Sequence, residues 1–293
     1  MHFHDRYGPA SRFNPASQHL GLLGPVLRAE VGDVLKVTFR NNLRAAANLV
    51  PLGGPLAAST AGGAGADWRG EPVAPGGEAT LYITVGEDAG PAEGDPSSVA
   101  WVYSSDVNGD ADMHSGLLGV VLVTRKDGAK SDGVPRDVVR EFVTVYHTFD
   151  ERRSRYRDLN VAKYATSGVA DTNSAEFKAA NKMHSINGFL YCNLPGLKVV
   201  QNNKVRWYTV ALGDASQFHA PRVSGGVFVG REREDHEARL GADAPMLMPG
   251  QSRTVDFVAD YAGIWSIGDT NNANAEAGMR ALFKVDQVLG GKD

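Results

Sequence analysis

Short apolar runs alternate with polar and turn residues along nearly the whole chain. Six of these runs are rich in Val, Leu, Thr, Phe and Tyr: Val34–Phe39, Ala79–Val85, Leu118–Thr124, Val138–Tyr146, Val205–Val210 and Thr254–Ala259. Several alternate apolar with polar positions, and glycine or proline bounds them, which is typical of half-buried β-strands. Helical periodicity is weak, and the best helix candidate is Asn173–Asn181 with Ser174 as its N-cap. The pattern predicts an all-β protein built as a Greek-key β-sandwich or barrel.

One succession of segments occurs twice along the chain. Each copy has a Pro-Gly turn and strand, then a tryptophan strand, then a strand that follows a glycine: Pro75–Ile83, Trp101–Tyr103 and Ser115–Val123, and later Pro249–Phe257, Trp265–Ile267 and Ala277–Val285. An internal repeat of this kind predicts two homologous domains in tandem. The polar stretch 129–135 suits a linker, so we expect domains at 1–128 and 136–293.

Composition excludes several classes of protein. The 293 residues include 30 Lys and Arg against 34 Asp and Glu, a net charge of -4 that argues against nucleic-acid binding. The longest apolar stretch, Gly116–Val123, is too short to span a bilayer, and no signal peptide is visible at the start of the chain. The single cysteine, Cys192, excludes an internal disulfide and any metal site built on several thiolates.

Several segments carry a family resemblance. His19–Asp33 resembles the opening of a cupredoxin domain pair in ceruloplasmin, hephaestin and the A domains of coagulation factors V and VIII. Met183–Gly188 is similar to the start of the second domain in this branch of the multicopper oxidase superfamily. The resemblance covers nearly the whole chain. It implies two tandem cupredoxin-like domains and a secreted or extracellular protein. Relatives usually have extra sequence before His19, so we expect a fragment or one pair from a longer tandem array.

The resemblance also implies copper, but most ligand positions hold other residues. A blue copper centre takes two imidazoles, a thiolate and a weak axial thioether. The first imidazole matches His219 and the thioether Met279, whereas Asp269 stands at the thiolate position and Asn274 at the second imidazole. The histidines of a trinuclear copper cluster are also replaced, at positions that include Val50, Leu52, Ser104, Asp106, Arg222, Ser224, Gly268 and Thr270. We therefore expect no copper cofactor, with His219 and Met279 as vestigial positions.

An acidic loop is a weaker metal candidate. Asp106, Asn108, Asp110 and Asp112 place oxygen atoms at every second position, as the start of an EF-hand does, but the terminal Glu is missing. The calcium site that the resemblance implies falls on 65–71, where only Asp67 and Glu71 offer carboxylates. A solvated turn is the competing interpretation of both segments. His184, by contrast, is expected to hydrogen-bond the backbone at a sheet end.

Three functional hypotheses remain open. The missing ligands favour a copper-free cupredoxin pair that acts as a structural or protein-interaction module, and they argue against multicopper oxidase activity. The second hypothesis is an enzyme that reuses the vacated pocket for acid/base chemistry, with His219, Asp269, Glu276 and Asp106 as candidate groups. The third is a ferroxidase-like multicopper oxidase component whose copper sites lie in other domains or subunits. Fold alone does not decide among them.

The expected partners follow from the same resemblance. Two-domain members of the superfamily assemble as part of a ring, so we expect a homotrimer or further tandem domains, with room for another protein partner. The interface would carry Val50, Leu52, Ser104 and Ser224 where relatives have histidines. Apolar and small side chains of this kind could pack directly.

Overall fold

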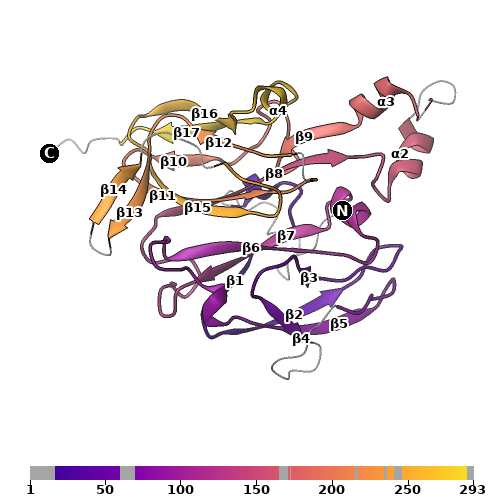
Figure 1. Ribbon diagram of the computed structural model, residues 1–293, viewed down its shortest axis with the longest axis horizontal. Helices are drawn as coiled ribbons and strands as arrows, with labels where there is room; N and C mark the ends of the chain where they lie inside the picture. The colour runs from indigo at the N-terminus through magenta and orange to yellow at the C-terminus, as the bar shows by residue number, and fades with distance from the viewer. Residues whose placement is uncertain are drawn as a thin grey trace.

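The computed structural model describes residues 17–59, 70–164, 171, 173–214, 217–233, 236–240 and 246–288, and these form four β-sheets with a few short helices (Figure 1). The strands of the first half are β1 Leu27–Glu30, β2 Val34–Arg40, β3 Val50–Pro51, β4 Ala57–Ser59, β5 Glu78–Thr84, β6 Ser98–Ser104 and β7 Leu118–Thr124. Those of the second half are β8 Arg140–Asp150, β9 Lys182–Ile186, β10 Lys198–Val200, β11 Lys204–Ala211, β12 Pro221–Val223, β13 Val227–Arg233, β14 His236–Leu240, β15 Ser252–Val258, β16 Gly263–Asp269 and β17 Arg280–Asp286.

The helices are short. They are α1 Asp110–His114, α2 Arg157–Tyr164, α3 Ala175–Ala180 and α4 Asn272–Glu276, with 3-10 turns η2 Gln18–Leu20 and η3 Glu87–Ala89. The expected cap of α3 is present, because the Ser174 hydroxyl accepts the Phe177 N–H at 3.0 Å. No helix in the described ranges is long and apolar enough to cross a membrane. The all-β prediction is confirmed, since sheets provide the architecture.

The strand arrangement repeats in the two halves. One sheet of the first half has the order β1-β7-β6-β3, with β1 parallel to β7 and the other pairs antiparallel. The sheet β10-β17-β16-β12 has the same order and the same directions. The remaining strands form β2-β5-β4 in the first half and β14-β13-β15-β11-β8-β9 in the second. The boundaries at 128 and 136 stay a prediction, although Ala129 and Pro135 do close the intervening turn in an isolated bridge.

A tryptophan packs over a glycine at the same place in each repeat. A Cβ atom on Gly54 would lie 2.6 Å from the Trp101 ring, and one on Gly225 would lie 2.2 Å from the Trp265 ring. Both glycines have positive φ angles, 76° and 84°. Each indole N–H donates to a backbone carbonyl oxygen at 2.8 Å. Glycine is therefore required twice, because the ring approaches the backbone too closely for a side chain.

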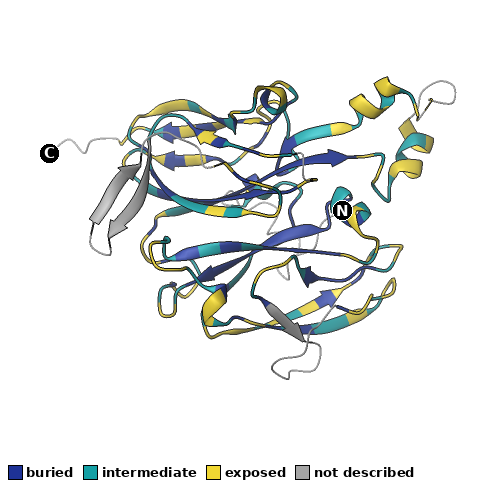
Figure 2. Cartoon of the chain, in the orientation of Figure 1, coloured by how far each residue is buried: buried dark blue, intermediate teal, exposed yellow. Residues whose placement is uncertain are grey.

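Three clusters of buried apolar side chains hold the molecule together. Figure 2 shows the buried residues mainly on the strands, whereas α2 and α3 are intermediate or exposed. One cluster lies within the first half and one within the second. The third joins the halves across β6 and β7 on one side and β8 and β11 on the other; it contains Leu23, Ala100, Val102, Leu118, Val120, Leu122, Val143, Val145, Phe149, Tyr208, Val210 and Leu212. Alternate residues of β7 belong to the first and third clusters, so this strand is buried on both faces. Its apolar run therefore lacks alternation.

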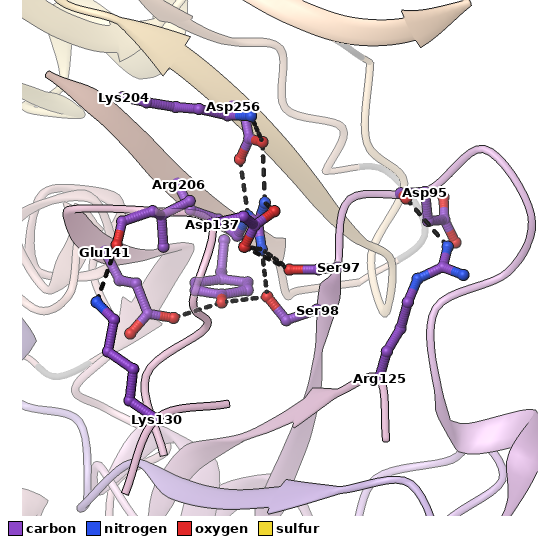
Figure 3. A network of polar contacts seen from close by, with 12 residues as sticks. Asp95, Ser97, Ser98, Arg125, Lys130, Asp137, Glu141, Lys204, Arg206 and Asp256 are labelled. Atoms are coloured by element: carbon purple, nitrogen blue, oxygen red, sulfur yellow. Dashed lines mark hydrogen bonds and ion pairs between the residues drawn. The ribbon is translucent and has the colours of Figure 1, made fainter. Parts of the chain in front are cut away.

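A network of charged and hydroxyl groups closes one side of the contact between the halves (Figure 3). The Arg206 side chain on β11 is fully buried. Its Nε and Nη2 donate to the two oxygens of Asp256 at 2.7 and 2.9 Å, and Nη2 also donates to Asp137 Oδ2 at 2.9 Å. Its Nη1 donates to the hydroxyls of Ser97 and Ser98, at 2.6 and 2.9 Å. One guanidinium thus links strands of both halves.

The same network continues through a buried tyrosine. Tyr208 donates its hydroxyl to Glu141 Oε1 at 2.5 Å and shares a 2.6 Å hydrogen bond with Ser98. Glu141 Oε2 forms an ion pair with Arg28 of the first half at 2.8 Å. Buried charges are tolerated only when they are paired and hydrogen-bonded, and this network meets that condition.

Two stacked imidazoles lie at another part of the contact. The rings of His114, at the end of α1, and His147, on β8, have centroids 5.3 Å apart and planes 20° apart. His114 Nδ1 accepts the N–H of Asp150 at 3.1 Å. His147 is 2% exposed, and a backbone hydrogen bond with Leu212 only partly opposes the effect of this burial on its pKa. Burial lowers the pKa of His147 to about 4, with a further lowering by His114.

Substituting Arg206 by Met should destabilise the folded protein by about 3–5 kcal/mol, because Asp256 and Asp137 would lose their buried cation. Urea unfolding of the wild type and R206M measures the change. Asp158→Ala is the matched control, since Asp158 pairs with Arg157 at an exposed site, and it should leave stability unchanged. A loss below about 1 kcal/mol in R206M would contradict the assigned role of the network.

His147 should make the fold sensitive to acid. Its pKa is about 4 in the folded state against 6.5 when free, so the unfolded chain binds more protons between these values and stability falls as pH drops from 6.5 to 4. His147→Leu should remove about 2 kcal/mol of the stability difference between pH 7 and pH 4.5, measured by urea unfolding at both pH values. Phe149→Leu, which changes a packing neighbour, should leave that difference unchanged. Equal pH dependence in the wild type and His147→Leu would contradict the expectation.

Candidate functional site

The four predicted blue-copper positions come from two segments of the second half. His219 precedes β12, and its backbone forms an isolated bridge with Leu247. Asp269 is the last residue of β16, Asn274 lies in α4, and Met279 directly precedes β17. The side chain of Asn271 starts α4 by accepting the Ala273 N–H at 3.1 Å. The structure brings His219, Asp269 and Asn274 into contact and buries Met279 in the core of the second half.

Four donors surround the Asp269 carboxylate. His219 Nδ1 lies 2.7 Å from Oδ2, and Asn274 Nδ2 donates to the same oxygen at 2.8 Å. The backbone N–H groups of Ala220 and Asn271 donate to Oδ1 at 3.0 Å each. Burial acts to raise the pKa of Asp269, but the bonds from His219, the two amides and Asn274 outweigh it, so the pKa lies below its usual value.

The contacts of Asp269 hold the loop that carries α4 in place. Both side chains of the His219–Asp269 pair are fully buried. The Asp269 N–H donates to the Met279 carbonyl oxygen at 3.1 Å, which closes the segment that carries α4. An imidazole beside a carboxylate is the usual partnership for proton transfer, but general acid/base catalysis needs a reacting group within reach. Complete burial and a fully bonded carboxylate favour a structural tie.

Two buried polar atoms at this position have no hydrogen-bond partner among the described residues. They are His219 Nε2 and the hydroxyl of Tyr146, a residue of β8. The two rings lie 5.9 Å apart. Sequence reasoning did not single out Tyr146, because a tyrosine in an apolar strand normally signals core packing.

The other acid/base candidates lie elsewhere. Glu276 is exposed at the end of α4. Asp106, in the first half, accepts a hydrogen bond from Asn48 Nδ2 at 2.8 Å and donates its backbone N–H to Asn48 Oδ1. The vacated pocket therefore does not gather the predicted set of four groups.

His184 differs from expectation. Its Nδ1 lies 3.2 Å from both the Thr148 hydroxyl and Asn274 Oδ1. The prediction of a hydrogen bond to the backbone is wrong, because β8 and α4 place these two side chains beside the ring. The Asn274 side chain therefore contacts His184 through Oδ1 and donates to Asp269 through Nδ2.

In the acidic loop, arginines face two of the four predicted calcium ligands. Asp112 is buried, pairs with Arg155, and accepts the Asn108 N–H. Asp110 pairs with Arg153. Guanidinium groups thus neutralise carboxylates that a calcium ion would need. Over the described ranges, no group of three or more His, Cys, Asp and Glu side chains could hold a metal ion. Asp67 of the second predicted calcium segment lies outside these ranges.

The positions that match trinuclear-cluster histidines fall on two different sheets. Those of the first half lie on or beside β3 and β6, and those of the second on or beside β12 and β16, which lie apart in Figure 1. Val50 and Ser104 pair with each other across β3 and β6, and both are buried. The expectation that they line an exposed packing surface is therefore wrong. Other parts of the same chain already cover their side chains.

Comparison with known proteins identifies the family. No model of a known protein family matches the chain. The chain is 33% identical over 278 residues to ferroxidase HEPHL1 of Homo sapiens, covering 94% of this chain and 23% of that protein. It is 32% identical over 283 residues to ceruloplasmin of Rattus norvegicus, covering 94% and 26%. The chain thus spans about a quarter of the length of these relatives. It belongs to the ceruloplasmin and hephaestin branch of the multicopper oxidases.

Solved structures show the fold to which the chain is similar. A multicopper oxidase superposes with a TM-score of 0.59 at 20% identity, covering 90% of this chain and 78% of that one. The copper nitrite reductase of Nitrosomonas europaea superposes with a TM-score of 0.59 at 18% identity, covering 90% and 83%. These likenesses confirm the predicted cupredoxin-like fold of this ceruloplasmin-branch chain.

The prediction that no cofactor is expected is wrong. The chain belongs to a multicopper oxidase family, and its structural neighbours are named as copper enzymes. The prediction rested on the ligand positions of this chain alone, whereas its homologues and structural neighbours are copper proteins. Copper is the cofactor that the homologues and structural neighbours have.

The residues at the matched blue-copper position do not fit the usual ligand set. That set requires two imidazoles and a thiolate in one plane. Here one imidazole faces a carboxylate at 2.7 Å, and the carboxylate is bound by three further donors. We therefore derive no chemical step through copper at this position.

The double variant Asp269→Cys with Asn274→His tests the matched positions. It supplies a thiolate and a second imidazole beside His219 and Met279, so added Cu(II) should produce an intense blue absorption band. The measurement is the visible spectrum during copper titration. Asp269→Cys with Asn274→Ala is the control and should give a weaker or shifted band, because one imidazole is missing. A folded double variant that stays colourless would show that the loop is wrongly matched.

Proposed function

We propose that this chain acts as a structural or protein-interaction domain pair within the multicopper oxidase superfamily. The supporting observation is the Asp269 carboxylate, which four donors bind at the matched copper position. The contact ties β12, β16 and α4 together without exposing a reactive group. The extracellular location implied by the family belongs to the same proposal.

An outward sheet face supports the proposed assembly as a homotrimer or with further tandem domains. On β16 and β17, Ile264 and Leu282 are 67% and 47% exposed. Leu282 pairs with Ser266, whose hydroxyl lies 3.2 Å from that of Ser224 on the adjoining segment. Ser224 is one of the positions that match family histidines. Exposed apolar side chains on one face of a sheet are typical of a surface that another chain covers.

A second candidate function is a ferroxidase-like component whose copper sites lie in other domains or subunits. It is supported by the ferroxidase relative, of which this chain spans only a quarter. This candidate requires the chain, together with the domains or subunits that carry copper, to oxidise ferrous iron, whereas the first does not. An iron-oxidation assay on the native assembly that contains this chain distinguishes the two.

Sedimentation velocity tests the proposed homotrimer. The wild-type chain should reach three times the monomer mass at high micromolar concentration, and Leu282→Asp should reduce it to the monomer, because a buried charge opposes association. Val34→Asp is the matched control, since Val34 is 58% exposed on β2 of the first half, and it should still associate. A monomeric wild type, or equal dissociation of both variants, would contradict the assembly proposed for this face.

A further inference from the structure

Two methionines and a phenylalanine share an exposed face outside His219. The backbones of His219 and Leu247 exchange hydrogen bonds of 2.9 and 2.7 Å, and both side chains are buried. Because side chains alternate along extended backbone, the flanking residues project to the opposite side. Phe218, Met246 and Met248 are accordingly 44%, 68% and 48% exposed. All three of these large apolar side chains are thus open to solvent.

The backbone of this segment is held in place. Leu247 is fixed by its bridge to His219, and the N–H of Met248 donates to Gln251 Oε1 at 2.9 Å. The N–H of Gln251 in turn donates to the Met248 carbonyl oxygen at 3.0 Å. The backbone around Met246 and Met248 is therefore held in place, and their two thioether side chains extend from the side opposite the Leu247 side chain.

The chemistry of this pair is that of a soft-metal site. Thioethers are soft ligands that select Cu(I) over harder divalent ions. Methionine is unbranched and has three rotatable bonds, so two of them at positions i and i+2 can converge on one ion. An aromatic face beside the ion adds cation–π attraction, and the antiparallel bridge between His219 and Leu247 sets Phe218 across from Met248.

We propose that Met246 and Met248 bind one Cu(I) ion at the surface, with the Phe218 ring beside it. The site is separate from the Asp269 position and does not rest on the proposed function. It takes a monovalent soft cation directly from solvent or from a carrier. Met279 is not part of it, because that side chain is buried in the core.

Methyl NMR with selectively labelled methionine tests the proposal. The chain has six methionines, so their methyl signals can be assigned by single substitutions. The apoprotein is titrated with Ag(I), and with Cu(I) kept reduced by ascorbate under argon. One equivalent of either ion should shift the Met246 and Met248 signals and leave Met279 unmoved. Zn(II) should shift neither, because it prefers nitrogen, oxygen and thiolate ligands.

Competition with a chromogenic Cu(I) chelator measures affinity in matched variants. M246L and M248L should each weaken binding at least tenfold, and the double variant should abolish it. Phe218→Leu should weaken it a few-fold. Met183→Leu is the control and should bind as the wild type does, since Met183 packs against the contact between the halves. Unchanged binding in the double variant, or a Met279 shift at one equivalent, would overturn the site.

Discussion

The apolar contact between the two halves is the constraint on which the rest of the structure depends. It buries the second face of β7, β8 and β11, each of which already has one face in its own core. Without it, strands such as Leu118–Thr124 would expose a row of valines and leucines to water. The buried Arg206 network borders the same contact and adds orientation, because a bidentate guanidinium accepts few alternative geometries.

The two segments that carry the family resemblance meet at this contact. Asn187 takes a left-handed φ of 54° and directs its side chain at β8, where Oδ1 accepts the Val145 N–H at 2.6 Å and Nδ2 donates to the Val143 carbonyl at 2.7 Å. Nδ2 also donates to the His19 carbonyl at 2.6 Å, and His19 Nε2 accepts the Val143 N–H. One asparagine thus joins the start of the first half to the first strand of the second. These hydrogen bonds of Asn187 give a structural reason for the particular sequence of Met183–Gly188.

Sequence patterns predict the strands well and the site less well, for a physical reason. The six predicted runs all fall largely on strands, and Leu118–Thr124 matches β7 at both ends. Short runs of apolar and β-branched residues bounded by turn residues can be recognised from neighbouring positions alone. β8 extends to Asp150 because its last residues pair with β9, and the local pattern of apolar residues does not reveal this pairing. Of the four donors to Asp269, His219 and Ala220 come from about fifty residues away and two of the four are backbone amides. Every residue except proline has a backbone N–H, so the amino-acid sequence does not reveal which of them donate to Asp269.

The Asp269 carboxylate organises the loop that carries α4. A buried carboxylate loses several kcal/mol of hydration unless donors replace water around it. At Asp269 those donors come from the same positions that the family resemblance matches to metal ligands, His219 and Asn274, with two amides fixed by the fold. The hydrogen bonds therefore hold the residue before β12, the end of β16 and α4 in one arrangement. The Asp269 N–H, which donates to the Met279 carbonyl oxygen, fixes the far end of the same loop, so the carboxylate-centred network is sufficient to give the loop a single conformation.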